Sequence, residues 1–160
     1  MTLYLGSKKV SPTKTITKEV SSMKPFFNAG GKCSNSTATS FEGIIQYSDT
    51  SNVTDMSNMF YSCSSLTSVP QLDTSNVTSM DSMFNVCSRL EEIHMINMKV
   101  DFDIHYSTKF TREALLEIIN NCYDLTTLNR TATLTMGTTN LAKLTDEDKL
   151  IATNKGWTLA

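Results

Sequence analysis

The fold is decided by residues 49–96, which read DTSNVTDMSNMFYSCSSLTSVPQL over 49–72 and DTSNVTSMDSMFNVCSRLEEIHMI over 73–96. The two copies are identical at 12 of 24 positions, without a gap. A fixed period of this length is typical of solenoid proteins, in which each unit buries its apolar face against its neighbours. Solenoids expose broad, regular surfaces, so the repeat favours a binding protein over an enzyme.

Apolar residues recur at equivalent positions of both copies. One group has the i, i+3, i+4, i+7 spacing that predicts one face of a short helix; in the first copy it consists of Met56, Met59, Phe60 and Cys63. Residues 66–69 predict a short strand that pairs with residues 90–93 of the next copy. Asn52 and Asn76, also one repeat apart, predict a ladder of hydrogen-bonded side chains. The methionines at repeat spacing are predicted to fill the core.

The C-terminal third has a different pattern that continues the order of strands and helices. Thr111 is a suitable N-cap for an amphipathic helix near 112–122, whose apolar stripe consists of Leu115, Ile118, Ile119 and Cys122. Residues 131–137 alternate like a strand that ends at a turn. Residues 144–148 have the spacing of a capping box that opens another helix. Residues 157–160 predict a last short strand.

The chain therefore divides into two parts. Residues 1–24 form a basic N-terminal arm that begins with a hairpin over 3–10, and residues 25–160 form the repeat domain. The repeat domain comprises an N-terminal cap (25–48), two 24-residue repeats (49–96) and C-terminal rungs with a cap (97–160).

The net charge of −2 conceals an uneven distribution. Residues 1–35 hold six lysines and one acid, giving +5, so the remaining residues carry −7. A basic arm on an acidic body could anchor the protein to an acidic partner or to a neighbouring subunit. A solvated tail is the alternative. If the arm is an anchor, its contact residues are expected to be Tyr4, Lys8, Lys9, Lys14 and Lys18.

The pattern DTSNVTxMxxMFxxCSxL, present at 49–66 and 73–90, resembles the BspA-type leucine-rich repeat of bacterial surface proteins. The repeat is common in mycoplasma lipoproteins and in gut bacteria and their phages. Residues 110–122 and 156–159 resemble a C-terminal cap found in phage and prophage structural proteins. The resemblance implies an α/β fold, a short leucine-rich-repeat solenoid with N- and C-terminal caps. It also implies protein or glycan binding without catalysis or a cofactor.

The outward residues of the expected rungs are the candidate binding residues: Thr67, Ser68, Glu91, Glu92 and His94. Adhesins of the resembled family are usually long and secreted, whereas this chain is short and shows no signal peptide. We therefore expect a phage or prophage virion-associated protein, with other virion proteins or a homo-oligomer as its assembly partners. A bacterial cell-surface adhesin, or a domain of one, is the alternative.

Other chemistries find little support in the sequence. No Gly-x-Ser-x-Gly elbow or phosphate-binding fingerprint is present, and the basic arm lacks arginine, which argues against nucleic acid. No stretch has the roughly 20 apolar residues of a membrane span. Asp101, Asp103 and His105 would share one face of a strand, where they could hold a divalent ion. The alternative is an ordinary solvent face with Phe102 and Ile104 pointing inward.

The four cysteines are predicted to be reduced packing residues. Cys63 and Cys87 lie one repeat apart, but a ladder holds stacked side chains parallel, which is poor geometry for a disulfide. No CxxC pair suggests a zinc site. A disulfide and a metal site are the alternatives, and no metal or cofactor is expected.

Overall fold

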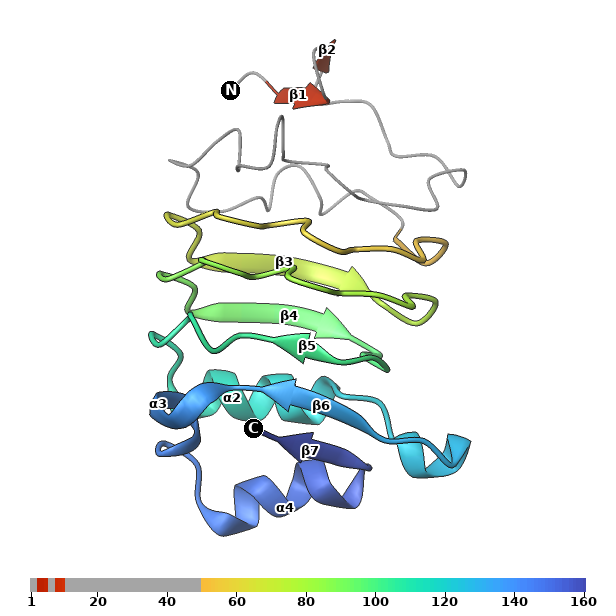
Figure 1. Cartoon of the computed structure of the whole chain (residues 1–160), viewed down its shortest axis with the longest axis vertical. Coiled ribbons are helices and arrows are strands. Elements are labelled where there is room, and N and C mark those ends of the chain that lie inside the picture. The colour runs from red at the N-terminus through yellow and green to blue at the C-terminus, as the bar shows by residue number, and fades with distance from the viewer. Residues whose placement is uncertain (1–2, 6–7, 11–49) are drawn as a thin grey trace.

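The computed structural model describes residues 3–5, 8–10 and 50–160, and Figure 1 shows their arrangement along the long axis of the chain. The elements are β1 (Leu3–Leu5), β2 (Lys8–Val10), β3 (Ser68–Asp73), β4 (Glu92–Ile96), β5 (Phe102–Asp103), α2 (Arg112–Asn121), a 3-10 helix η1 (Leu125–Leu128), β6 (Ala132–Thr135), α3 (Gly137–Leu141), α4 (Asp146–Asn154) and β7 (Trp157–Leu159). Successive turns of the chain from residue 50 onward lie one upon another (Figure 1).

The predicted N-terminal hairpin is confirmed in its strands. β1 and β2 pair antiparallel, with Leu3 opposite Val10 and Leu5 opposite Lys8. Of the predicted anchoring residues, Tyr4 lies on β1 and both Lys8 and Lys9 lie on β2. Lys14 and Lys18, the rest of the arm and the predicted cap at 25–48 lie outside the described residues.

The two repeats pair in parallel with an offset of one repeat length. Ser68 of β3 lies opposite Glu92 of β4, and Val69 lies opposite Ile93, as the sequence period predicts. The strands begin two residues later than expected. The register shifts between Val69 and Leu72, where Pro70 lacks the N–H that a regular ladder would use.

The predicted helix at residues 56–63 is wrong. The chain forms tight turns there, with Met59 N–H donating to the Met56 carbonyl (3.2 Å) and Cys63 N–H to the Phe60 carbonyl (3.0 Å). Asn58 has a φ of 58°, which a right-handed helix cannot accommodate. Other backbone amides bond to the next repeat instead, as in Phe60 N–H to the Met83 carbonyl at 3.0 Å. All four apolar side chains are nevertheless buried.

The predicted asparagine ladder takes a different form. The Asn76 amide donates to the backbone carbonyl of Ser51 (2.6 Å), and the Asn52 amide lies 3.5 Å from the Ser51 hydroxyl. The structure also contains a ladder of threonine side chains, which the sequence did not predict. The buried Thr50 and Thr74 hydroxyls, one repeat apart, donate to the carbonyls of Asp73 and Ile96 at the start of the next turn (3.0 and 2.8 Å). A buried hydroxyl needs such a partner, and it fixes the corner of each turn.

The C-terminal elements follow the predicted order, with two additions, the 3-10 helix η1 and the short helix α3. Thr111 caps α2 by accepting from Ala114 N–H (3.2 Å), and the Thr145 and Asp148 capping box opens α4. β5, β6 and β7 form a parallel sheet in that order. The short helix α3 begins at Gly137, where only a turn was expected. The stripe Leu115, Ile118, Ile119 and Cys122 is buried, as predicted.

The core runs continuously from the repeats into the C-terminal sheet. Phe60 and Phe84, one repeat apart, stack with ring centroids 5.8 Å apart and planes at 7°. Phe102 packs edge-on against Trp157 at 5.9 Å. The repeat methionines are buried, as predicted: Met56, Met59, Met80 and Met83. This rigid stack holds the outward side chains at fixed spacing.

Candidate functional site

We refer to the predicted binding residues together as the β3–β4 face: Thr67, Ser68, Glu91, Glu92 and His94. The structure brings them together, because the Thr67 carbonyl accepts from the N–H groups of Glu91 (2.8 Å) and Glu92 (3.1 Å). The two glutamates are exposed, while Thr67 and His94 are half-buried. Ser68 differs from the expectation. Its Oγ is buried and has no hydrogen-bond partner among the described residues.

His94 joins the β3–β4 face to the neighbouring helix. Its Nδ1 lies 2.7 Å from Glu117 Oε1 on α2, and its Nε2 lies 3.6 Å from Glu92 Oε2. The hydrogen bond to Glu117 raises the pKa of His94 above its ordinary value, and partial burial opposes that rise. Glu117 therefore extends the face onto α2. The sequence did not indicate it, because it lies 23 residues from His94 on an element of another type.

The Asp101, Asp103 and His105 triplet does not form one site. Asp101 Oδ1 accepts from Thr133 N–H (2.7 Å), whereas Asp103 Oδ1 lies 2.6 Å from His105 Nδ1. Phe102 and Ile104 are buried, so the inward orientation expected for these two side chains is confirmed. Within the described residues, no three His, Cys, Asp or Glu side chains are close enough to hold a metal ion together.

The cysteine prediction is wrong for Cys63, which is disulfide-bonded. Cys87 and Cys122 are free and buried, as predicted. Burial raises the pKa of each of these two thiols to about 12. They are therefore protonated near neutral pH and unsuited to nucleophilic chemistry.

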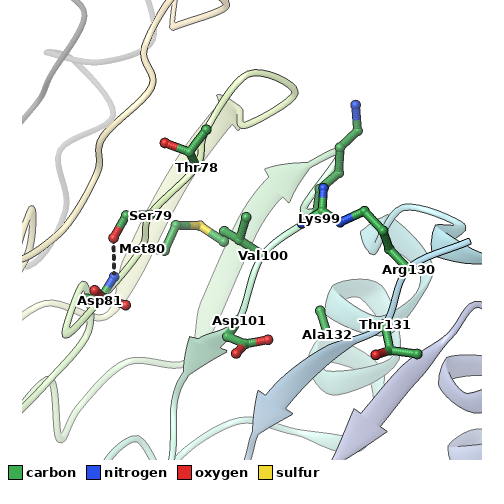
Figure 2. A pocket seen from close by; sticks show the side chains of 10 residues that line it. All are labelled: Thr78, Ser79, Met80, Asp81, Lys99, Val100, Asp101, Arg130, Thr131 and Ala132. Atoms are coloured by element: carbon green, nitrogen blue, oxygen red, sulfur yellow. Dashed lines mark hydrogen bonds between the residues drawn. The ribbon is translucent and has the colours of Figure 1, made fainter. Parts of the chain in front are cut away.

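A cavity of about 270 Å³ lies between the second repeat and the C-terminal sheet. Figure 2 shows its lining: Thr78, Ser79, Met80, Asp81, Lys99, Val100, Asp101, Arg130, Thr131 and Ala132. Three segments far apart in the sequence contribute two acids, two bases and three hydroxyls. Sequence reasoning singled out only Asp101, because no local pattern links the three segments.

Lys99 is already engaged at the rim of this cavity. Its Nζ lies 4.4 Å from the centre of the Tyr123 ring and donates to the Ser75 carbonyl at 3.3 Å. A cation above an aromatic face is attracted by the negative charge density of the ring. The ammonium of Lys99 is therefore held beside the cavity by contacts of its own.

Within the described part of the chain, no helix has the length and apolar character needed to span a bilayer.

A family model described as "Mycoplasma protein of unknown function, DUF285" matches residues 32–114, slightly more than half of the 160 residues. No curated protein and no solved structure matches the chain significantly. The matched segment includes both 24-residue repeats and reaches the start of α2. The chain therefore belongs to the family of Mycoplasma proteins of unknown function, DUF285.

Proposed function

We propose that the chain is a non-enzymatic interaction module built on a short leucine-rich-repeat solenoid of the BspA type, with N- and C-terminal caps. Hydrogen bonds between residues one repeat apart support this fold assignment, as in the parallel pairs Ser68–Glu92 and Asp55–Ser79. The buried apolar residue at each equivalent position supports it further. In a stack of this kind, function resides in the outward side chains, because the inward ones are consumed by packing.

The β3–β4 face is the proposed contact surface for a host-surface protein or glycan. One observation carries this assignment: the exposed side chains of Glu91 and Glu92, with His94 beside them, project from backbone that is held in register with the preceding repeat. Preorganised side chains lose little conformational freedom on binding. Glu117 adds a further carboxylate on α2, so the partner is expected to present positive or hydroxyl-rich groups.

We place this module outside the cytoplasm, on a phage or prophage virion, with residues 1–24 as the anchor. The Cys63 disulfide supports an extracellular setting, because disulfides persist mainly in oxidising environments. A bacterial surface adhesin is the second candidate. This second candidate is favoured by the match to a family described from Mycoplasma, because Mycoplasma is a cellular organism with a surface of its own.

The binding proposal is tested with fluorescently labelled full-length protein on intact bacterial cells. The variant Glu91→Ala/Glu92→Ala/His94→Ala removes the exposed part of the β3–β4 face. The control Asp146→Ala/Glu147→Ala removes two exposed acids from α4. We expect saturable binding of the parent protein and of the control, and at least a tenfold loss for the triple variant. Equal binding by all three proteins would exclude this face as the contact surface.

The anchor proposal is tested by light scattering on the full chain and on a chain lacking residues 1–24. A defined oligomer that becomes a monomer on truncation, with an unchanged circular dichroism spectrum, is the expected result. An unchanged mass would show that the arm does not drive assembly between copies of the chain.

A further inference from the structure

The cavity arises where the backbone hydrogen bonding from one repeat to the next stops. In the first two turns, Met56 N–H donates to the Ser79 carbonyl (3.0 Å) and Asn58 N–H to the Asp81 carbonyl (2.9 Å). One repeat beyond Ser79 lies Asp103, which pairs with Thr135 of β6 and makes no backbone hydrogen bond to Ser79. Within the described part of the chain, no backbone hydrogen bond joins residues 78–86 to residues 102–110. Backbone hydrogen bonds therefore do not join the third turn to the second along this stretch, and the cavity lies between them.

The lining of the cavity includes three exposed charged side chains, those of Asp81, Asp101 and Arg130. The exposed Asp81 carboxylate and the exposed Arg130 guanidinium form no hydrogen bond or ion pair with any described residue. Asp101 uses one carboxylate oxygen, Oδ1, to accept from Thr133 N–H, and its other oxygen is available. The half-buried Val100 adds an apolar side chain between these groups, beside the buried Met80.

The backbone of Arg130 is held in place by two contacts. Its N–H donates to the Leu125 carbonyl at 3.1 Å, and its carbonyl lies against Gly156. Gly156 has a φ of 82°, and a Cβ there would lie 3.0 Å from the Arg130 oxygen. The glycine thus permits both the left-handed turn and the close approach. In Figure 2 the Arg130 side chain extends toward Lys99 and Val100, across the cavity from Asp81.

These groups select a neutral, hydroxyl-rich ligand. Two acids and two bases line the cavity, so their charges cancel. A simple anion would be opposed by Asp81 and Asp101, and a metal cation by Lys99 and Arg130. A sugar hydroxyl both donates and accepts, so it can donate to a carboxylate and accept from a guanidinium. The volume lies just below the range of about 300–1,000 Å³ for larger ligands, which suits one sugar ring.

We propose that the cavity between the second repeat and β6 is a binding site for a single neutral sugar residue, held by Asp81, Asp101 and Arg130. It shares no residue with the β3–β4 face. The site would give the module a second contact, with a glycan, independent of the surface proposed for its main partner. Two weak contacts on one rigid body raise the overall affinity when both are engaged.

Saturation-transfer NMR and calorimetry on the full chain test this site with glucose, galactose, mannose, N-acetylglucosamine and N-acetylgalactosamine. The variants are Asp81→Asn and Arg130→Gln, and their matched controls are Asp146→Asn and Arg89→Gln, at exposed positions outside the cavity. We expect at least one sugar to bind saturably, about tenfold more weakly to each cavity variant, and unchanged to the controls. Sodium acetate and calcium chloride are expected not to compete.

Three results would overturn the proposal: no saturable binding of any of these sugars, equal affinity in the parent and both cavity variants, or displacement of the sugar by acetate or calcium. The triple variant of the β3–β4 face separates this proposal from the preceding one. It should bind the sugar normally while losing cell binding. Sugar binding lost in that variant would place the sugar on the β3–β4 face and refute the cavity site.

Discussion

The replacement Phe84→Ala tests whether the repeats share one core. Phe84 is only 1% exposed, and its ring stacks on Phe60 of the preceding turn with a centroid separation of 5.8 Å. The substitution deletes the whole ring and leaves a cavity between two turns. No outward side chain of the β3–β4 face is changed.

The expected loss of unfolding free energy is large. Deleting a buried phenylalanine ring typically costs about 3–5 kcal/mol, against a total stability of about 5–15 kcal/mol for a domain. For a chain of this length, each kcal/mol shifts the melting temperature by roughly 2–4 °C. A loss of about 4 kcal/mol therefore lowers Tm by roughly 8–16 °C.

Urea unfolding followed by tryptophan fluorescence and by circular dichroism measures this loss. The single tryptophan, Trp157, is buried in β7 and reports the C-terminal sheet, whereas circular dichroism reports the whole chain. The control is Leu150→Ala, which alters a side chain that is 54% exposed on α4 and should change stability by no more than about 0.5 kcal/mol.

A double-mutant cycle with Phe60→Ala gives the coupling between the two rings. Stacked aromatic pairs contribute about 0.5–1.5 kcal/mol beyond their buried area, so the two losses should not be additive. A Phe84→Ala loss below about 1 kcal/mol, or strict additivity, would refute a shared core built on this stack.

Three further predictions concern local features. Glu117 raises the pKa of His94. The stabilisation from this pair is therefore complete below the ordinary pKa of 6.5 and is lost as pH rises through the raised value. Glu117→Gln should move the pKa of His94, measured by NMR, back toward 6.5, and an unchanged pKa would contradict this. Val86 is 41% exposed and has a φ of 62°, in the left-handed region where a β-branched residue is strained and asparagine is tolerated. Val86→Asn should therefore raise the free energy of unfolding in urea by about 1 kcal/mol. A lower free energy of unfolding would disprove this strain. The Arg112 guanidinium lowers the pKa of Asp148. The stabilisation from this ion pair is therefore present above the ordinary pKa of 3.8 and is lost as pH falls through the lowered value. Arg112→Gln should raise the pKa of Asp148, as measured by NMR, and the absence of a rise would exclude the pairing.

Sequence reasoning succeeded where a pattern is local or strictly periodic. Thr111 and the Thr145–Asp148 pair cap their helices as expected, because a cap depends on residues three positions apart. The pairing of Ser68 with Glu92 follows from the 24-residue period alone. The predicted helix at 56–63 failed because its apolar spacing also suits a chain that winds through tight turns and bonds to the next repeat.

The residues of the candidate sites also divide into those that the repeat predicted and those that it could not predict. The repeat placed Glu91 and Glu92 beside Thr67 and Ser68, because residues at equivalent positions of stacked turns must be neighbours. It could not place Glu117 beside His94 or decide that Cys63, and not Cys87, is disulfide-bonded. The contact of His94 with Glu117 joins the repeats to α2, which lies outside them, and the period carries no information about such a segment.

The sequence by itself determined the period of the stack, its buried positions and its helix caps, since these depend on short-range spacing and on side-chain polarity. The cavity beside Arg130 was decided only by the tertiary structure. It exists because the backbone hydrogen bonds that join the first two turns do not continue between residues 78–86 and 102–110, a choice among long-range contacts. Such a choice depends on the packing of the whole C-terminal sheet, and no local stretch of sequence encodes it.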